Sequence, residues 1–177
     1  MNLTKIGTAQ AALVGPGGVG KTTLGLTARA QRFVSADYTV YMTVHVLTII
    51  SEDIELYLQT YDVAGQEQFK AMGLNSRLLE GTQAAAVVFD VADLDETLDK
   101  LPEWIADLPE AVPKLLVGNK TDLLSEPFDE KELWPLKKAY KFEEVLFTSA
   151  KELSSVNTLF TKLAALAVVP RQIELTR

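Results

Sequence analysis

A glycine-rich motif near the start of the chain has residue types and spacing suited to binding phosphate. It reads Gly15-Pro16-Gly17-Gly18-Val19-Gly20-Lys21-Thr22 and matches the pattern G-x-x-x-x-G-K-[ST]. Such a backbone can point its N–H groups at phosphate oxygens, and the start of a following helix adds partial positive charge. We expect Lys21 to reach the β- and γ-phosphates and the Thr22 hydroxyl to ligate Mg²⁺. The motif predicts a nucleoside triphosphate without selecting its base, and an incidental glycine turn is the alternative.

A second motif, Asn119-Lys120-Thr121-Asp122, follows a short apolar run at residues 115–118. A carboxylate such as Asp122 at the end of a strand can accept two hydrogen bonds from the edge of guanine. Adenine presents a lone pair in place of the guanine ring N–H. The carboxylate would then lose its donor and face that lone pair, at a cost of about 1–3 kcal/mol in binding free energy. Asn119 can bond both the base and nearby loops, and the Lys120 stem can cover the purine face. A polar turn after a strand is the alternative for these four residues alone.

A third segment, Thr148-Ser149-Ala150-Lys151, follows the last predicted strand and opens the last predicted helix. A backbone N–H in this segment could meet the guanine oxygen. Residues of these types also form an ordinary Ser/Thr helix cap. The segment therefore favours guanine only in combination with the other two motifs.

The elements that must position these motifs follow from the hydrophobic pattern, in which short apolar runs alternate with helical spacing. Strands are predicted at residues 9–14, 43–50, 54–61, 84–90, 114–117 and 145–148, with a hairpin between the second and third. Helices are predicted at residues 22–31, 95–108 and 129–140, with Pro135 kinking the third or ending its first part. A final helix follows from the apolar spacing of residues 156–167, and we expect Pro170 to stop it. This pattern indicates a largely parallel sheet in a single domain spanning residues 1–177.

Composition restricts the classes of function. The 177 residues carry 17 basic and 24 acidic side chains, a formal charge of 17 − 24 = −7, which disfavours nucleic acid as a partner. Cysteine is absent and histidine occurs once, which excludes thiolate chemistry and a multi-histidine metal site. No apolar run approaches the roughly 18–20 residues of a membrane span, and neither end predicts a covalent membrane anchor. We therefore expect a cytoplasmic protein.

Four motifs occur in one order along the chain: the phosphate loop, Asp62-Val63-Ala64-Gly65-Gln66-Glu67, Asn119-Lys120-Thr121-Asp122 and Ser149-Ala150-Lys151. In this order and at these spacings they resemble the Ras-like small GTPases, over nearly the whole chain from about Ala9 to Leu166. The resemblance implies a three-layer α/β domain, with a mostly parallel six-stranded sheet, one antiparallel edge strand and helices on both faces. It also implies GTP and GDP as ligands, Mg²⁺ as cofactor, and slow GTP hydrolysis that changes the conformation of two switch loops.

The resemblance assigns hydrolytic and metal roles to residues around the second of these four motifs. Asp62 would hold Mg²⁺ through water. Gly65 would donate its N–H to the γ-phosphate and serve as a hinge when that phosphate leaves. Gln66 would orient the attacking water, so the catalytic set is Gln66, Lys21 and Gly65. A solvated loop amide is the alternative for Gln66.

The first switch should supply a threonine that completes the Mg²⁺ coordination, and Thr39 and Thr43 are the candidates. Counting back from Asp62 by 62 − 39 = 23 positions favours Thr39, whereas Thr43 can simply begin the edge strand. Phe33 resembles the aromatic residue that packs against the base, with a core phenylalanine as the alternative. Thr23, beside the phosphate loop, belongs to the predicted nucleotide-binding residues.

No arginine completes the hydrolytic site in cis, since Arg29, Arg32 and Arg77 read as solvated helix charges. An arginine supplied in trans accelerates such hydrolysis by about 10³–10⁵-fold, which predicts an activating protein. Exchange proteins and effectors that bind the switch loops are implied as well, while hydrolysis within a homodimer or through a rearranged switch stays open. The competing functions are a guanine-nucleotide-binding scaffold that hardly cycles and a metabolic kinase. The chain has no spare length for the lid that a kinase needs.

Three further side chains read as structural. His45 is predicted to be a half-exposed cross-strand residue in the first strand of the hairpin. Trp104 and Trp134 lie in helical stretches and are expected to anchor packing.

Overall fold

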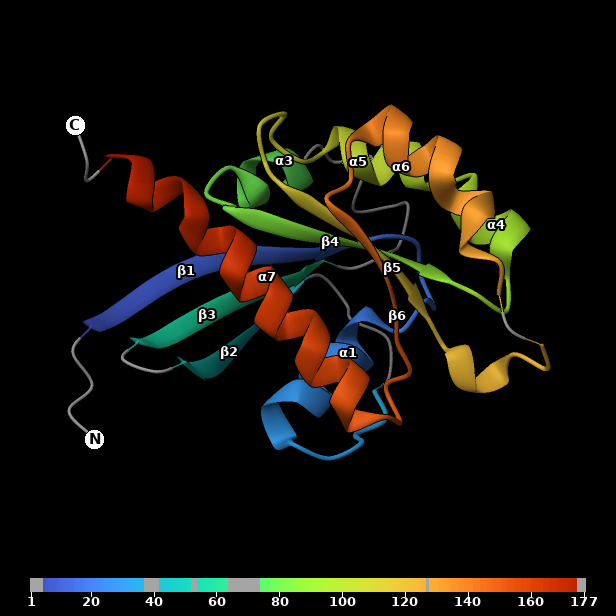
Figure 1. Cartoon of the computed structure of the whole chain (residues 1–177), viewed down its shortest axis with the longest axis horizontal. Coiled ribbons are helices and arrows are strands. Elements are labelled where there is room, and N and C mark those ends of the chain that lie inside the picture. Colours follow the sequence, from blue (N-terminus) through green and yellow to red (C-terminus); the bar gives the residue numbers. More distant parts are fainter. Residues whose placement is uncertain (1–4, 37–41, 52–53, 64–73, 127, 175–177) are drawn as a thin grey trace.

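The computed structural model describes residues 5–36, 42–51, 54–63, 74–126 and 128–174, and its centre is a six-stranded sheet (Figure 1). The strands are β1 (Lys5–Val14), β2 (Met42–Ser51), β3 (Ile54–Val63), β4 (Ala84–Asp90), β5 (Lys114–Asn119) and β6 (Glu144–Phe147). Their order across the sheet is β2-β3-β1-β4-β5-β6. Every neighbouring pair is parallel except β2 and β3, which form the predicted antiparallel hairpin. The predicted fold class is confirmed.

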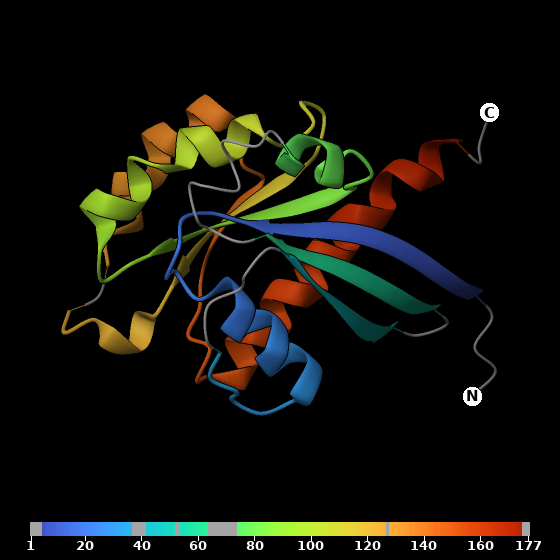
Figure 2. The same cartoon turned by 180° about the vertical axis from the view of Figure 1, so that it is seen from behind.

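Helices cover both faces of the sheet, as Figures 1 and 2 show from opposite sides. One face packs against α1 (Lys21–Ala30) and α7 (Leu153–Glu174). The other face packs against α3 (Leu74–Leu79), α4 (Leu94–Leu98), α5 (Leu101–Ala106) and α6 (Trp134–Tyr140). Short 3₁₀ helices occur at η1 (Thr121–Leu123) and η2 (Glu130–Leu133). Within the described part of the chain, no helix has both the length and the apolarity to cross a membrane.

The central strand β4 shows why the sheet forms two cores. All seven of its residues are buried, and they are apolar up to the final aspartate, because helices cover both of its faces. Alternate residues of β4 join opposite cores: Ala84, Ala86 and Val88 face α1 and α7, while Ala85, Val87 and Phe89 face the other layer. The predicted apolar stripe of α7 packs into the first core, and it comprises Val156, Leu159, Phe160, Leu163, Ala164 and Ala167.

Prolines set two helix boundaries, at Pro102 and Pro135, but not the one predicted at Pro170. The expectation that Pro170 stops the last helix is wrong, because α7 continues to Glu174. A proline in a helix interior costs about 3 kcal/mol, and five packed turns before it can offset that cost. The single helix predicted at residues 95–108 is also wrong: α4 ends at Leu98 and α5 starts at Leu101, because Pro102 cannot donate to the Leu98 carbonyl. Pro135 ends the first part of the 129–140 stretch as predicted, and it lies in the first turn of α6 after η2.

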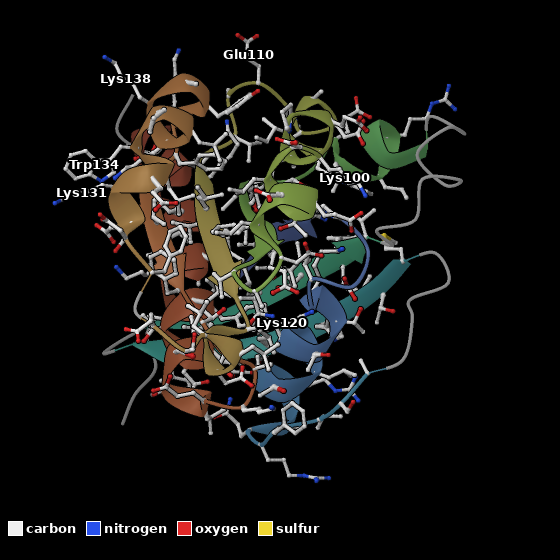
Figure 3. The ribbon with its side chains drawn as sticks, turned by 90° about the vertical axis from the view of Figure 1, so that its right-hand side faces the viewer. Lys100, Glu110, Lys120, Lys131, Trp134 and Lys138 are labelled. Atoms are coloured by element: carbon white, nitrogen blue, oxygen red, sulfur yellow. The ribbon has the colours of Figure 1, made fainter. Side chains whose placement is uncertain are left out.

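Two side-chain expectations are wrong. His45 is 0% exposed in β2, because its ring lies under α1 where that helix carries a glycine. Trp134 is 57% exposed at the start of α6 and points away from the body of the molecule (Figure 3). Trp104, by contrast, is 3% exposed and belongs to the core beneath α5.

Candidate nucleotide-binding site

The predicted motifs meet at one edge of the sheet. Five strands run in the same direction, so their carboxyl ends lie side by side, and ligands of open α/β sheets bind at that edge. The phosphate loop follows β1, Asp62 lies near the end of β3, and Asp90 ends β4. The base motif at residues 119–122 ends β5, and the segment at residues 149–151 follows β6. Figure 3 shows Lys120 of this group beside the start of α1.

The phosphate loop depends on a glycine where it enters α1. Gly20 caps the helix with a φ of 96°, in the left-handed region that residues with a Cβ avoid. A Cβ at this position would lie 2.5 Å from the Asn119 Nδ2 atom. Only glycine therefore lets the loop pack against the base motif of β5, so the phosphate and base motifs are joined directly.

The Lys21 side chain folds back onto the phosphate loop and bonds its backbone. Its Nζ atom donates hydrogen bonds of 2.7 Å to the carbonyl oxygens of Gly15 and Pro16, and it lies 5.8 Å from the centre of the Trp104 ring. An ammonium has three N–H donors, so two bonds to the loop leave capacity for one to a phosphate oxygen. Burial lowers the Lys21 pKa from 10.5 to about 8, and the nearby Asp62 carboxylate opposes this shift.

The residues on the metal side of the loop provide oxygen ligands. Asp62 is fully buried at the end of β3, and Thr22 follows Lys21 in the first turn of α1. A carboxylate and a hydroxyl suit Mg²⁺, which prefers oxygen ligands and takes few of them from the protein. Within the described residues, no three histidine, cysteine or acidic residues cluster as a metal site. The oxygen donors present therefore fit Mg²⁺ held partly by a nucleotide's phosphates.

A cavity of about 150 Å³ lies beside this loop, where the base is expected. Its lining comprises Thr23, Phe33, Asn119, Lys120, Asp122, Leu123, Ala150 and Lys151. Phe33 and Leu123 are 45% and 58% exposed, so both apolar side chains are available to cover a flat ring. The position of Phe33 supports the base-packing interpretation over the core phenylalanine.

Asp122 links the base motif to the loop after β6. One carboxylate oxygen accepts a hydrogen bond of 2.6 Å from the Ser149 hydroxyl, and the other lies 2.7 Å from the Lys151 ammonium. These contacts, with Lys151 contributing most, hold the pKa of Asp122 below its usual value. The carboxylate is therefore kept in the acceptor-only form that reading two guanine N–H groups requires.

Asn119 and Lys120 are also held by side-chain contacts. The buried Asn119 side chain donates a hydrogen bond of 2.9 Å to the Val19 carbonyl oxygen. It also accepts a hydrogen bond of 3.1 Å from the Thr148 hydroxyl. Lys120 has a positive φ of 69°, and its ammonium lies 2.6 Å from an Asp90 carboxylate oxygen. Asn119 thus connects the phosphate loop to the residue that follows β6, and Asp90 holds the Lys120 ammonium.

Several predicted switch residues lie outside the described residues: Thr39, Gly65 and Gln66. Thr43 is described, and it lies inside β2 directly opposite Asp62 in the strand register. This position agrees with the alternative that Thr43 begins the edge strand. The choice of Thr39 as the switch threonine stays a prediction.

Sequence reasoning missed three residues of the site. Asp90 contacts Lys120, Leu123 lines the cavity where the base is expected, and Trp104 lies beside the Lys21 ammonium. The rule that ligands bind at the carboxyl ends of parallel strands could have indicated Asp90. A second cavity, of about 380 Å³, also has Lys120 in its lining, together with Gly17, Asp90 and Trp104.

A phosphate loop at the first strand–helix turn and a base pocket built from the last two strand ends define a P-loop nucleotide-binding protein. The Ras family model matches residues 10–168. Ras-related protein Rab-1C of Dictyostelium discoideum is 31% identical over 163 residues, covering 86% of this chain and 77% of the relative. Ras-related protein RABD2b of Arabidopsis thaliana and Rab-7b of Bos taurus are each 32% identical, covering 86% and 88% of this chain and 77% and 80% of their own lengths.

The chain belongs to the Ras family. It is a GTP-binding switch protein that hydrolyses GTP to GDP and phosphate, and it acts with regulator and effector proteins as members of this family do.

Proposed function

We propose that this chain binds GTP and GDP in the crevice formed by the phosphate loop and the Asp122 pocket, with each predicted residue in its assigned role. The observation that supports this most directly is the set of contacts joining the motifs: Asn119 reaches the loop at Val19, and Asp122 reaches Ser149 and Lys151. The loop amides and Lys21 would hold the phosphates. Asp122 would accept from the guanine edge, and the Ser149–Lys151 segment would meet the guanine oxygen.

We propose further that Thr22 and Asp62 hold Mg²⁺, with Thr39 as the third protein contributor. When bound, the ion neutralises charge on the β- and γ-phosphate oxygens. Thr22 would bind through its hydroxyl, and Asp62 would bind through water. The burial of Asp62 and its closeness to Lys21 support a carboxylate that acts on the phosphate side of the crevice.

For hydrolysis we propose that Gln66 orients the attacking water while Gly65 contacts the γ-phosphate. The ordered motifs support these assignments. Within the described part of the chain, no arginine lines either cavity beside Lys120, and Arg29, Arg32 and Arg77 are all exposed. This supports an arginine supplied in trans by an activating protein, or by a second copy of the chain. The two cores share one sheet, which supports a single domain over residues 1–177.

The nucleotide that accompanies the purified protein tests this proposal. Protein denatured after purification without added nucleotide should release close to one equivalent of GDP or GTP, identified by anion-exchange chromatography. A single-turnover assay with radiolabelled GTP and Mg²⁺ should then release phosphate slowly. Release of ATP, or a protein that stays empty after incubation with GDP, would contradict the proposed site.

A further inference from the structure

A buried polar group lies on the sheet directly behind the phosphate loop, in a layer that is otherwise apolar. On the face of the hairpin covered by α1, Leu47 of β2 and Leu58 of β3 are buried apolar residues, as a core predicts. Towards the nucleotide, this pattern changes to His45, Thr60 and Asp62, each of them 0% exposed. Only Asp62 of these three has a role in the proposed function.

His45 faces Asp62 directly. The imidazole Nε2 atom lies 3.8 Å from the Asp62 Oδ2 atom. In the strand register His45 pairs with Thr60, so Asp62 lies diagonally across from it on the same face. Asp62 also interacts electrostatically with Lys21. The same carboxylate is therefore close to the imidazole and is linked by charge to the ammonium of the phosphate loop.

Helix α1 is built to admit this ring. A Cβ at Gly25 would lie 2.3 Å from Cδ2 and 2.5 Å from Nε2 of His45, closer than any side chain could approach. Glycine in a helix interior costs about 1 kcal/mol relative to alanine. The helix thus has an unfavourable residue at the one turn that faces the imidazole.

Packing alone does not explain a histidine at this position. Among the described residues, neither ring nitrogen of His45 has a hydrogen-bond partner. A buried polar group without a partner costs about 1–3 kcal/mol, a cost that a leucine of similar volume would avoid. A shift of about 1 Å would bring Nε2 within hydrogen-bond distance of Asp62.

We propose that His45 is a positioning residue for Asp62, and that its Nε2–H donates to the Asp62 carboxylate when nucleotide and Mg²⁺ are bound. The proposal rests on the proposed role of Asp62 at the metal. Outer-shell groups, such as a carboxylate that holds a metal-bound water, contribute about 10–100-fold to metal affinity, and a hydrogen bond from His45 would fix the orientation of that carboxylate. His45 acts on the metal only through Asp62, and Gly25 provides the space for it to do so.

The Mg²⁺ dependence of GDP release measures this role. With fluorescent GDP bound, the free Mg²⁺ concentration that half-maximally slows release should rise about tenfold or more in His45→Leu. His45→Gln keeps an N–H donor and should stay nearer the wild-type value, within about threefold. In EDTA, where Asp62 has no metal to support, all three proteins should release GDP at similar rates. A half-effective Mg²⁺ concentration within twofold of wild type in His45→Leu would overturn the proposal.

A second variant perturbs the same contact from α1. Gly25→Ala leaves the imidazole intact but forces it away, and it should raise the required Mg²⁺ concentration in the same direction as His45→Leu. Leu47→Val is the matched control, because it shortens a buried side chain on the same face of β2 without touching Asp62. An equal rise in Leu47→Val would assign the effect to general loosening of the core and would overturn the proposal.

The wild-type protein provides a test that needs no variant. Because His45 is the only histidine in the chain, ¹⁵N-histidine labelling gives a single pair of ring-nitrogen signals. Adding MgCl₂ to the GDP complex at constant pH should move the Nε2 signal more than the Nδ1 signal. Unchanged Nε2 would overturn the proposal. If Mg²⁺ fails to slow GDP release even in the wild type, the proposed metal role of Asp62 has failed instead, and the two failures are thereby distinguished.

Discussion

The groups proposed to bind the base are partly exposed and contact one another, whereas Lys21, proposed to bind the phosphates, is buried and bonds the loop itself. At the base, Asp122 is bound by Ser149 and Lys151, and the Lys151 side chain is 61% exposed. At the phosphates, Lys21 is 5% exposed and bonds the carbonyls of Gly15 and Pro16. At the base, the charge of Asp122 is stabilised by neighbouring side chains. At the phosphates, the charge of Lys21 is disfavoured by burial.

The pKa shifts express this difference. Lys151 and Ser149 lower the Asp122 pKa and so stabilise its charged form, whereas burial lowers the Lys21 pKa to about 8 and so destabilises its charged form. A phosphate group returns negative charge to Lys21, while guanine only offers donors to a carboxylate that is already ionised. The comparison teaches that affinity should depend mainly on the phosphate side and selectivity mainly on the base side.

Removing the buried ammonium should have the largest effect. Lys21→Met should weaken GDP binding by about 10²–10⁴-fold, since the loss of one partner from a buried charged contact costs about 3–5 kcal/mol. Isothermal titration calorimetry measures the change. Lys114→Met is the control, because Lys114 is also a buried lysine but starts β5 at the opposite edge of the sheet. Tight GDP binding by Lys21→Met would refute the dominance of the phosphate side.

Changing Asp122, the proposed base-reading residue, should alter nucleotide selectivity more than overall nucleotide affinity. In Asp122→Asn the side chain gains an amide donor, which faces the guanine amine unfavourably but suits the oxygen of xanthine. The ratio of GDP to XDP affinity should fall by about 10²–10³-fold, corresponding to two hydrogen bonds at roughly 1–3 kcal/mol each. Competition with a fluorescent nucleotide gives the ratio, and Asp129→Asn, in an exposed cap of η2, should leave it unchanged.

Gln66→Leu should slow GTP hydrolysis without weakening nucleotide binding at either region. Because neither region is predicted to orient water, GDP affinity should stay within about twofold, while single-turnover GTP hydrolysis should slow by about 10²-fold through loss of the water's orientation. Gln59→Leu in β3 serves as the control for the same chemical change on the sheet. Unchanged hydrolysis would remove Gln66 from its assigned role.

The smallest effect should appear in the pH dependence of binding. Phosphate favours charged Lys21, so binding takes up a proton once the pH exceeds the free-protein pKa of about 8. GDP affinity should accordingly fall by about eightfold from pH 7.5 to pH 9, the ratio of the charged fractions of Lys21 at those values. Lys21→Arg stays charged and should show no such fall. If GDP affinity falls equally with pH in the wild type and in Lys21→Arg, the pH dependence belongs to a group other than Lys21.

Local pattern predicted the elements well wherever one local rule determined them. The apolar run of β4 and the helical stripe of α7 were predicted correctly, since covered strands and amphipathic helices have distinctive spacings. Pro102 and Pro170 were misjudged for opposite reasons. The first prevents a bond to Leu98 and splits a helix, whereas the second lies in a helix that packing supports.

The site shows the same division. Motif residues such as Lys21 and Asp122 could be predicted because their chemistry requires a fixed order of residue types along the chain. Asp90 and Trp104 could not, because each contacts a motif residue that lies far away in sequence. Such contacts are set by strand order, which the chain's local pattern does not encode.

The sequence by itself determined that this chain has a glycine-rich phosphate-loop motif, a motif predicted to read guanine and the alternating elements of a Ras-like domain, because these depend on residues close together in the chain. Only the tertiary structure decided that the lone histidine is buried against the proposed metal carboxylate. That contact needs the hairpin register, which places His45 diagonally from Asp62, and the approach of α1 at Gly25. Each is a distance between segments that meet only when the sheet and its helices assemble.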